Sequence, residues 1–190
     1  ALFTFAGMVV SRAGVNAAGI CYGDIPISGE TVNAQENALS AFRSVLYDLN
    51  RLDTTIDWIN TSSQGRKHTY LLGDGRYEQR GAKLLIDGNL RTLVRDYDTK
   101  DNYYPFVLSN VVYEGDTDKR DIYNYINKNY GLFVENGLYI LTQKGAISGS
   151  NLMNLIIDAT AFKGYVAFAN GTRDASTQAY MVVDFQSILP

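Results

Sequence analysis

The sequence has very little of the residue types that most catalytic and metal sites require. Among its 190 residues there is one cysteine and one histidine. Because Cys21 stands alone, no disulfide can form within the chain, which fits a reducing compartment such as a bacterial cytoplasm. His68 follows Arg66 and Lys67 in an expected loop, so we predict a solvated surface histidine and not a catalytic one. A zinc site of the usual nitrogen and sulfur ligands is accordingly not expected.

An excess of positive charge and a long hydrophobic run are also missing. The 17 lysines and arginines are outnumbered by 20 aspartates and glutamates, which gives a formal net charge of −3 at pH 7. Proteins that bind nucleic acid through its phosphates need an excess of lysine and arginine. The apolar segment 1–10 ends at Ser11, at about half of the roughly 20 residues that a membrane-spanning helix needs. We therefore expect neither sequence-specific DNA binding nor a membrane-spanning segment.

Carboxylates are plentiful, but their spacing does not match a binding site. A calcium loop would need carboxylates at alternating positions, a central glycine and a closing glutamate. Lysine or arginine interrupts both acidic clusters of this chain, so we predict solvated loops of mixed charge. The two clusters are Asp96, Asp98, Asp101 and Asp116, Asp118, Asp121. The sequence thus predicts no catalytic residue, no metal site and no cofactor, and a protein that is not an enzyme.

The abundant residue types are typical of a globular chain that is rich in tyrosine. Hydrophobic residues make up 46% and charged residues 19% of the sequence, which is the balance of a folded domain and not of a disordered chain. Fourteen tyrosines, eight phenylalanines and one tryptophan are present. Tyrosine suits protein interfaces and equally the surface of a β-sheet, so this composition leaves both interpretations open.

The segment before residue 53 has the periodicity of helices. A short helix is predicted over 4–13, ended by Gly14, and a glycine-rich connection follows over 15–29. A longer helix is predicted over 30–52, because apolar residues recur there at intervals of three and four. Its apolar stripe consists of Leu39, Phe42, Leu46, Leu49 and Leu52. Two such helices joined by a turn are expected to pack as an antiparallel hairpin.

Beyond residue 53 the pattern changes to short apolar runs separated by turns. The segment T-T-I-D-W-I-N alternates as a strand does, and a hairpin is predicted over 69–79. A short strand over 83–86 with a turn at 87–88 is predicted next, and the following segment 90–94 fits a helix or a strand equally. Further strands are expected over 152–160, 165–169 and 180–185, and residues 122–130 have a helical pattern. The predicted fold class is α+β: a helical hairpin module over 1–53 packed with a β-rich module over 54–190, in one compact unit.

The opening of the chain resembles a family of phage proteins. A short segment T-F-A-G-M-V-V-S-R-A-G-V, a loop ending I-S-G-E-T-V, and the segment A-L-S-A-F-R-S-V-L-Y-D-L-N-R-L followed by Trp58 are similar in layout to the head-to-tail adaptors of short-tailed bacteriophages, the group that includes tail tubular protein A. The resemblance covers residues 1 to about 60. Beyond them only short, weakly specific pieces match.

The resemblance implies a structural role in the neck of a virion, after synthesis in the host bacterial cytoplasm. Such adaptors form homo-oligomeric rings, commonly twelvefold, that dock on the portal protein and carry the tail nozzle protein, while double-stranded DNA passes through the lumen. It also implies that the apolar residues of the long helix and the following tryptophan make helix-packing and subunit contacts. In this chain those residues are Leu39, Phe42, Leu46, Leu49, Leu52 and Trp58.

Two other interpretations of the sequence stay open. One is a different tail or capsid structural protein with a β-sandwich, against which only the first 60 residues argue. The other is a small carbohydrate-binding or carbohydrate-hydrolysing domain, for which surface aromatic residues and paired acids would be the relevant features.

Overall fold

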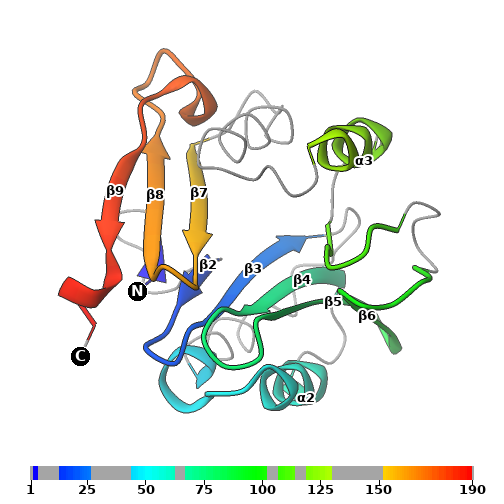
Figure 1. Cartoon of the computed structure of the whole chain (residues 1–190). Coiled ribbons are helices and arrows are strands. Elements are labelled where there is room, and N and C mark those ends of the chain that lie inside the picture. The colour runs from blue at the N-terminus through cyan, green and yellow to red at the C-terminus, as the bar shows by residue number, and fades with distance from the viewer. Residues whose placement is uncertain are drawn as a thin grey trace. The chain divides into compact units, whose positions relative to one another are not determined.

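The computed structural model describes residues 2–3, 13–26, 44–62, 67–101, 107–113, 119–129 and 152–189. The chain divides into two compact units, Ala1–Glu114 with Ser187–Pro190, and Gly115–Gln186. Each unit has its own antiparallel sheet (Figure 1). Over the part of the chain described, no helix is long and apolar enough to cross a membrane.

The first unit is built on a six-stranded sheet in which each strand pairs with the next along the chain. All of these pairings are antiparallel. The strands are β1 (Leu2–Phe3), β2 (Ala13–Val15), β3 (Ile20–Pro26), β4 (Lys67–Asp74), β5 (Arg80–Asp87) and β6 (Leu90–Arg95). The long insertion between β3 and β4 includes the helical residues of this unit.

One face of this sheet is covered by helix. Residues 44–48 are helical, and α2 (Leu52–Ser62) contacts β4 and β5 (Figure 1). Leu52, Ile56 and Ile59 recur at intervals of four and three, so they share one side of α2 and are buried. From the strands, this core receives Ile20, Tyr22, Tyr70, Leu72, Ala82, Leu84 and Ile86. Strand alternation explains the set, because residues directly opposite in an antiparallel pair lie on the same face.

The predicted α+β fold with an N-terminal helical hairpin is wrong. The structure is mostly β, and the predicted connection over 15–29 includes β3, a central strand of the first sheet. Gly19, at φ 84°, and the Asn16 carboxamide, which accepts a hydrogen bond from the Ile20 amide at 2.9 Å, form a tight turn between β2 and β3. The glycines that indicated a loop therefore serve a hairpin turn and strand positions instead.

The structure describes only part of each of the two predicted helices. Of the helix predicted over 4–13, residues 4–12 lie outside the described residues, and Ala13 begins β2. Of the helix predicted over 30–52, residues 30–43 are likewise outside them, and 44–48 are helical. The Asn16 side-chain nitrogen donates to the backbone oxygens of Val45 and Leu49, at 3.1 and 2.6 Å. This contact satisfies carbonyls at the end of a helical turn, where the helix itself supplies no partner.

The strand predicted at T-T-I-D-W-I-N is also wrong, because these residues lie in α2. The hydroxyl groups of Thr54 and Thr55 donate to the backbone oxygen of Arg51, at 3.0 and 2.7 Å. Threonine near a helix start finds such a backbone partner, so its β-branching does not prevent the helix. The hairpin predicted over 69–79 is present as β4 and β5, but residues 76–79 lie in its turn and not in its second strand. The strand predicted over 83–86 lies in β5, and the segment 90–94, expected as either helix or strand, lies in β6.

The other face of the first sheet buries a charged pair. Lys83 lies on β5 opposite Val94, and its side chain is 2% exposed. Its ammonium group contacts the carboxylate of Asp101, which is 8% exposed, and the backbone oxygen of Tyr113 at 3.4 Å. Asp101 was predicted to lie in a solvated loop, so the structure corrects that prediction. Because neither ion is solvated, each depends on the other for its charge balance.

Cys21 lies on β3 directly opposite Gly73, and its thiol points at the backbone oxygen of that glycine, 3.5 Å away. A side chain at Gly73 would place its Cβ 2.8 Å from the sulfur atom, so the glycine makes room for the thiol. Burial, with a smaller contribution from the negative charge of Asp74, raises the pKa of Cys21 from 9.0 to about 11. The thiol is therefore kept in its neutral, unreactive form.

We expect alkylation of Cys21 by iodoacetamide at pH 8 to be about a hundredfold slower in the folded protein than in the urea-unfolded chain, because the thiolate is the reactive form. The folded state holds this proton more tightly than the unfolded chain. The raised pKa of Cys21 therefore stabilises the folded state. This contribution is fully present below pH 9 and is lost as the pH rises toward about 11. Mass spectrometry of the alkylated fraction against time and pH measures both rates. Equal rates in the two states at pH 8 would contradict the expectation.

The second unit contains a three-stranded antiparallel sheet of β7 (Met153–Asp158), β8 (Lys163–Phe168) and β9 (Met181–Asp184). These strands and α3 (Lys119–Lys128) confirm the short strands predicted after residue 152 and the helical pattern predicted over 122–130. Phe185 is fully buried and packs edge-on against Phe162, with ring centroids 5.6 Å apart. Its ring also closes against Gly164, where an added Cβ would lie 2.6 Å from it.

Candidate interaction surface

Arginine and tyrosine side chains collect around the start of α2 and the adjacent end of the first sheet. We call this set the arginine–tyrosine surface, and it consists of Arg51, Tyr77, Arg80, Arg95 and Tyr97. Arg51 directly precedes α2, Tyr77 lies in the β4–β5 turn, Arg80 begins β5, and Arg95 and Tyr97 lie at the end of β6 and just after it. The contacts described below pair Arg51 with Tyr77 and Arg80 with Tyr97, and they join Arg95 to Asp53.

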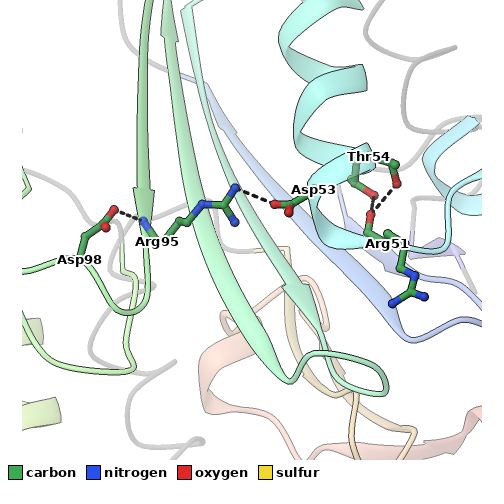
Figure 2. Close-up of polar contacts among 6 residues, drawn as sticks. Arg51, Asp53, Thr54, Arg95 and Asp98 are labelled. Atoms are coloured by element: carbon green, nitrogen blue, oxygen red, sulfur yellow. Dashed lines mark hydrogen bonds and ion pairs between the residues drawn. The ribbon is translucent and has the colours of Figure 1, made fainter.

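Arg51 and Tyr77 form a close stack. The guanidinium carbon of Arg51 lies 3.2 Å from the centre of the Tyr77 ring, and Tyr77 is 66% exposed. The backbone of Arg51 is fixed, because its oxygen accepts hydrogen bonds from Thr54 and Thr55 at the start of α2 (Figure 2). A guanidinium stacked on an aromatic face keeps its N–H groups at the rim of the stack, where they remain able to bind an acceptor.

A second arginine connects α2 to the edge of the sheet. Arg95 reaches from the end of β6 to the Asp53 carboxylate at 2.6 Å, while its backbone N–H donates to Asp98 (Figure 2). The hydrogen bond that Arg95 donates to Asp53 raises the pKa of Arg95, so this arginine stays charged. In the same view Arg51 points away from this pair. Asp53 is 61% exposed, so the ion pair positions Arg95 more than it stabilises the fold.

The third arginine repeats the same pairing with an aromatic ring. Arg80 lies over the Tyr97 ring, 5.5 Å from its centre, and 3.7 Å from a carboxylate oxygen of Asp96. That oxygen is buried and accepts no hydrogen bond from the described residues, whereas the other accepts one from the Gly81 amide at 2.9 Å. The predicted solvated loop at Asp96 is thus also corrected, since this aspartate is buried against the end of the sheet.

The turn that displays Tyr77 is rigid. The Asp74 carboxylate is buried and accepts hydrogen bonds from the backbone N–H groups of Arg76, Tyr77 and Glu78, at 2.9, 2.7 and 3.2 Å. The Arg76 guanidinium donates to the backbone oxygen of Ala17, at 3.0 Å, which ties the turn to the β2–β3 turn. Binding residues on a turn held in this way lose little conformational entropy when a partner binds.

Tyrosine and arginine are the residue types enriched in the energetically dominant positions of protein interfaces. The arginine–tyrosine surface has this composition, it is partly exposed, and its members are held in place by the contacts above. It is therefore suited to binding another protein surface.

The structure describes four of the six residues that were expected to make helix-packing and subunit contacts. Leu39 and Phe42 lie outside the described residues. Leu46, Leu49 and Trp58 are partly buried and pack against the core of the first unit, and Leu52 is fully buried in it. The described members of this set thus contact their own chain. Sequence reasoning missed Arg51 and Tyr77, for which the only available signal was the high tyrosine content.

His68 does not lie on the surface as predicted. It is buried on β4, with Nδ1 2.6 Å from a carboxylate oxygen of Asp24 on β3, and its ring stacks on Tyr70. Within the described ranges, no group of three or more histidine, cysteine, aspartate or glutamate side chains is placed to hold a metal ion. The His68–Asp24 pair is accordingly a buried polar contact inside the first sheet.

No protein-family model matches the chain, and no curated protein is significantly similar to it in sequence. Function is therefore proposed from the residues and their geometry.

Proposed function

We propose that this protein is a structural component of a bacteriophage particle, which acts by binding copies of itself and neighbouring particle proteins and not by catalysis. The observation that carries the proposal is the arginine–tyrosine surface. Arg51 stacked on the exposed ring of Tyr77, with the turn fixed by Asp74, has the composition and rigidity of a protein-binding site.

Within this class, a head-to-tail adaptor in the neck of the virion is the most specific proposal. The layout of residues 1–60 supports it by its resemblance to such adaptors, although the helical hairpin predicted for this segment is wrong. The protein would then form a ring of about twelve copies, dock on the portal protein and carry the tail nozzle protein. The net charge of −3 for each copy suits a lumen through which double-stranded DNA slides without being held.

The antiparallel sheets of both units favour a second candidate. A tail or capsid protein of another kind, built mainly from antiparallel strands, agrees better with a six-stranded and a three-stranded sheet than a helical adaptor does. In that case the arginine–tyrosine surface would bind other shell or tail subunits.

Native mass spectrometry and electron microscopy of the purified chain, alone and mixed with a portal protein, separate the two candidates. We expect a head-to-tail adaptor to bind the portal and to form closed rings of about twelve copies. Sheets, tubes or shells of the chain, with no portal binding, would favour the second candidate. A chain that stays monomeric and binds neither itself nor any particle protein would contradict both.

A further inference from the structure

At the Arg51–Tyr77 stack of the arginine–tyrosine surface, a cation and a neighbouring carboxylate have no ion-pair partner in the described structure. Arg51 stacks on Tyr77 and takes part in no ion pair there. Glu78, the next residue along the β4–β5 turn, has an exposed side chain that is likewise not paired with a basic group. The turn fixes its backbone, because the Glu78 N–H donates to Asp74. One rigid surface therefore presents both charges beside an exposed aromatic ring.

A surface with an unpaired cation and an unpaired carboxylate side by side is complementary to itself. The rim of the stacked Arg51 guanidinium offers parallel N–H groups, which match the two oxygens of a carboxylate. Glu78 lies one residue from the ring on which Arg51 stacks, yet no ion pair joins the two within one chain. In a two-fold contact, each copy presents the same patch, so residue i of one copy meets residue j of the other and the reverse.

We infer that two copies of this chain associate through a two-fold contact in which Arg51 of each copy binds Glu78 of the other. The two exposed Tyr77 rings lie at the centre of this contact and supply its apolar area. The inference does not depend on the place of the protein in a virion. A two-fold contact forms a dimer in solution, whereas ring closure needs two different surfaces on each copy.

Charge reversal tests this contact by sedimentation velocity over a range of protein concentrations. We expect the unmodified chain to dimerise, and Arg51→Glu and Glu78→Arg each to weaken dimerisation by at least about tenfold, because each places like charges opposite one another twice. An equimolar mixture of the two variants should form a heterodimer, since both contacts then join opposite charges. The double variant Arg51→Glu/Glu78→Arg should dimerise as well.

A matched charge reversal at an exposed position of the same unit, outside the contact, serves as the control. Lys100→Glu changes the net charge by the same amount as Arg51→Glu and should leave dimerisation unchanged. Circular dichroism checks that every variant is folded. If a reversal unfolds the chain, Arg51→Gln and Glu78→Gln replace it, each with weaker dimerisation expected.

The inference is overturned if the unmodified chain stays monomeric or if it dimerises equally well with either charge reversed. It is also overturned if mixing the two variants does not restore dimerisation. The portal-binding and ring measurements leave these outcomes unaffected. If the chain dimerises as the charge-reversal predictions require but binds no portal protein, only the proposed role as a head-to-tail adaptor is contradicted.

Discussion

Asp101→Asn is expected to lower the free energy of unfolding of the first unit by about 3–5 kcal/mol, which is the usual cost of removing one partner from a buried ion pair. The Lys83 side chain is 2% exposed and would lose the carboxylate that now contacts its ammonium group. The Tyr113 carbonyl, 3.4 Å from that group, does not replace a full negative charge. Urea unfolding followed by Trp58 fluorescence measures the loss, because this tryptophan packs against the core of the same unit.

Removing both charges together is the control for this prediction. Lys83→Met/Asp101→Leu should recover most of the lost stability, since apolar residues of similar size often replace a buried ion pair at little cost. Surface ion pairs contribute about 1 kcal/mol or less, so Asp53→Asn, which removes the exposed partner of Arg95, should change stability only within that range. A loss of stability at Asp101 as small as that at Asp53 would show that the Lys83–Asp101 pair is solvated.

Local signals in the sequence were sufficient for one hairpin of the first unit. The β4–β5 hairpin, and the strand and turn at the end of β5, were predicted from short apolar runs beside Asp-Gly turns, and each is formed within a few residues of chain. The strands of the second unit were found for the same reason. In each of these elements the residues that determine the structure are near neighbours in sequence, so the pattern alone contains the information.

The elements that were predicted incorrectly depend on distant contacts. β3 becomes a strand by pairing with β4, which places Cys21 beside Gly73, and no local pattern marks that partner. In α2, Ile56 and Trp58 fit an alternating pattern while Leu52, Ile56 and Ile59 fit a helical one. The core against β4 and β5 decides between the two, because it buries the helical set.

The candidate site was beyond sequence reasoning for the same physical reason. Arg51 and Tyr77 meet only because α2 packs on the sheet and Asp74 holds the β4–β5 turn beside the start of that helix. The leucines expected to make helix-packing and subunit contacts were the stronger signal by periodicity, and the described ones, Leu46, Leu49 and Leu52, pack in the core of the first unit. Periodicity identifies which residues are buried, but it does not show whether they are buried against the same chain or against a partner.

Phe185→Ala is expected to destabilise the second unit by about 3–5 kcal/mol, the usual cost of removing a buried aromatic side chain. The ring is fully buried, packs edge-on against Phe162 and occupies the space above Gly164 on β8. Amide hydrogen exchange of β7, β8 and β9 gives the measurement, because it reports the opening free energy of this unit separately from the first.

Gly164→Ala should cost about 1–3 kcal/mol by overpacking, since its Cβ would lie 2.6 Å from the Phe185 ring. In the Phe185→Ala background that second substitution should cost almost nothing, because the ring that it strikes is gone. Equal costs in both backgrounds would mean that Phe185 does not pack on Gly164, and the core of the second unit would then be formed by other residues.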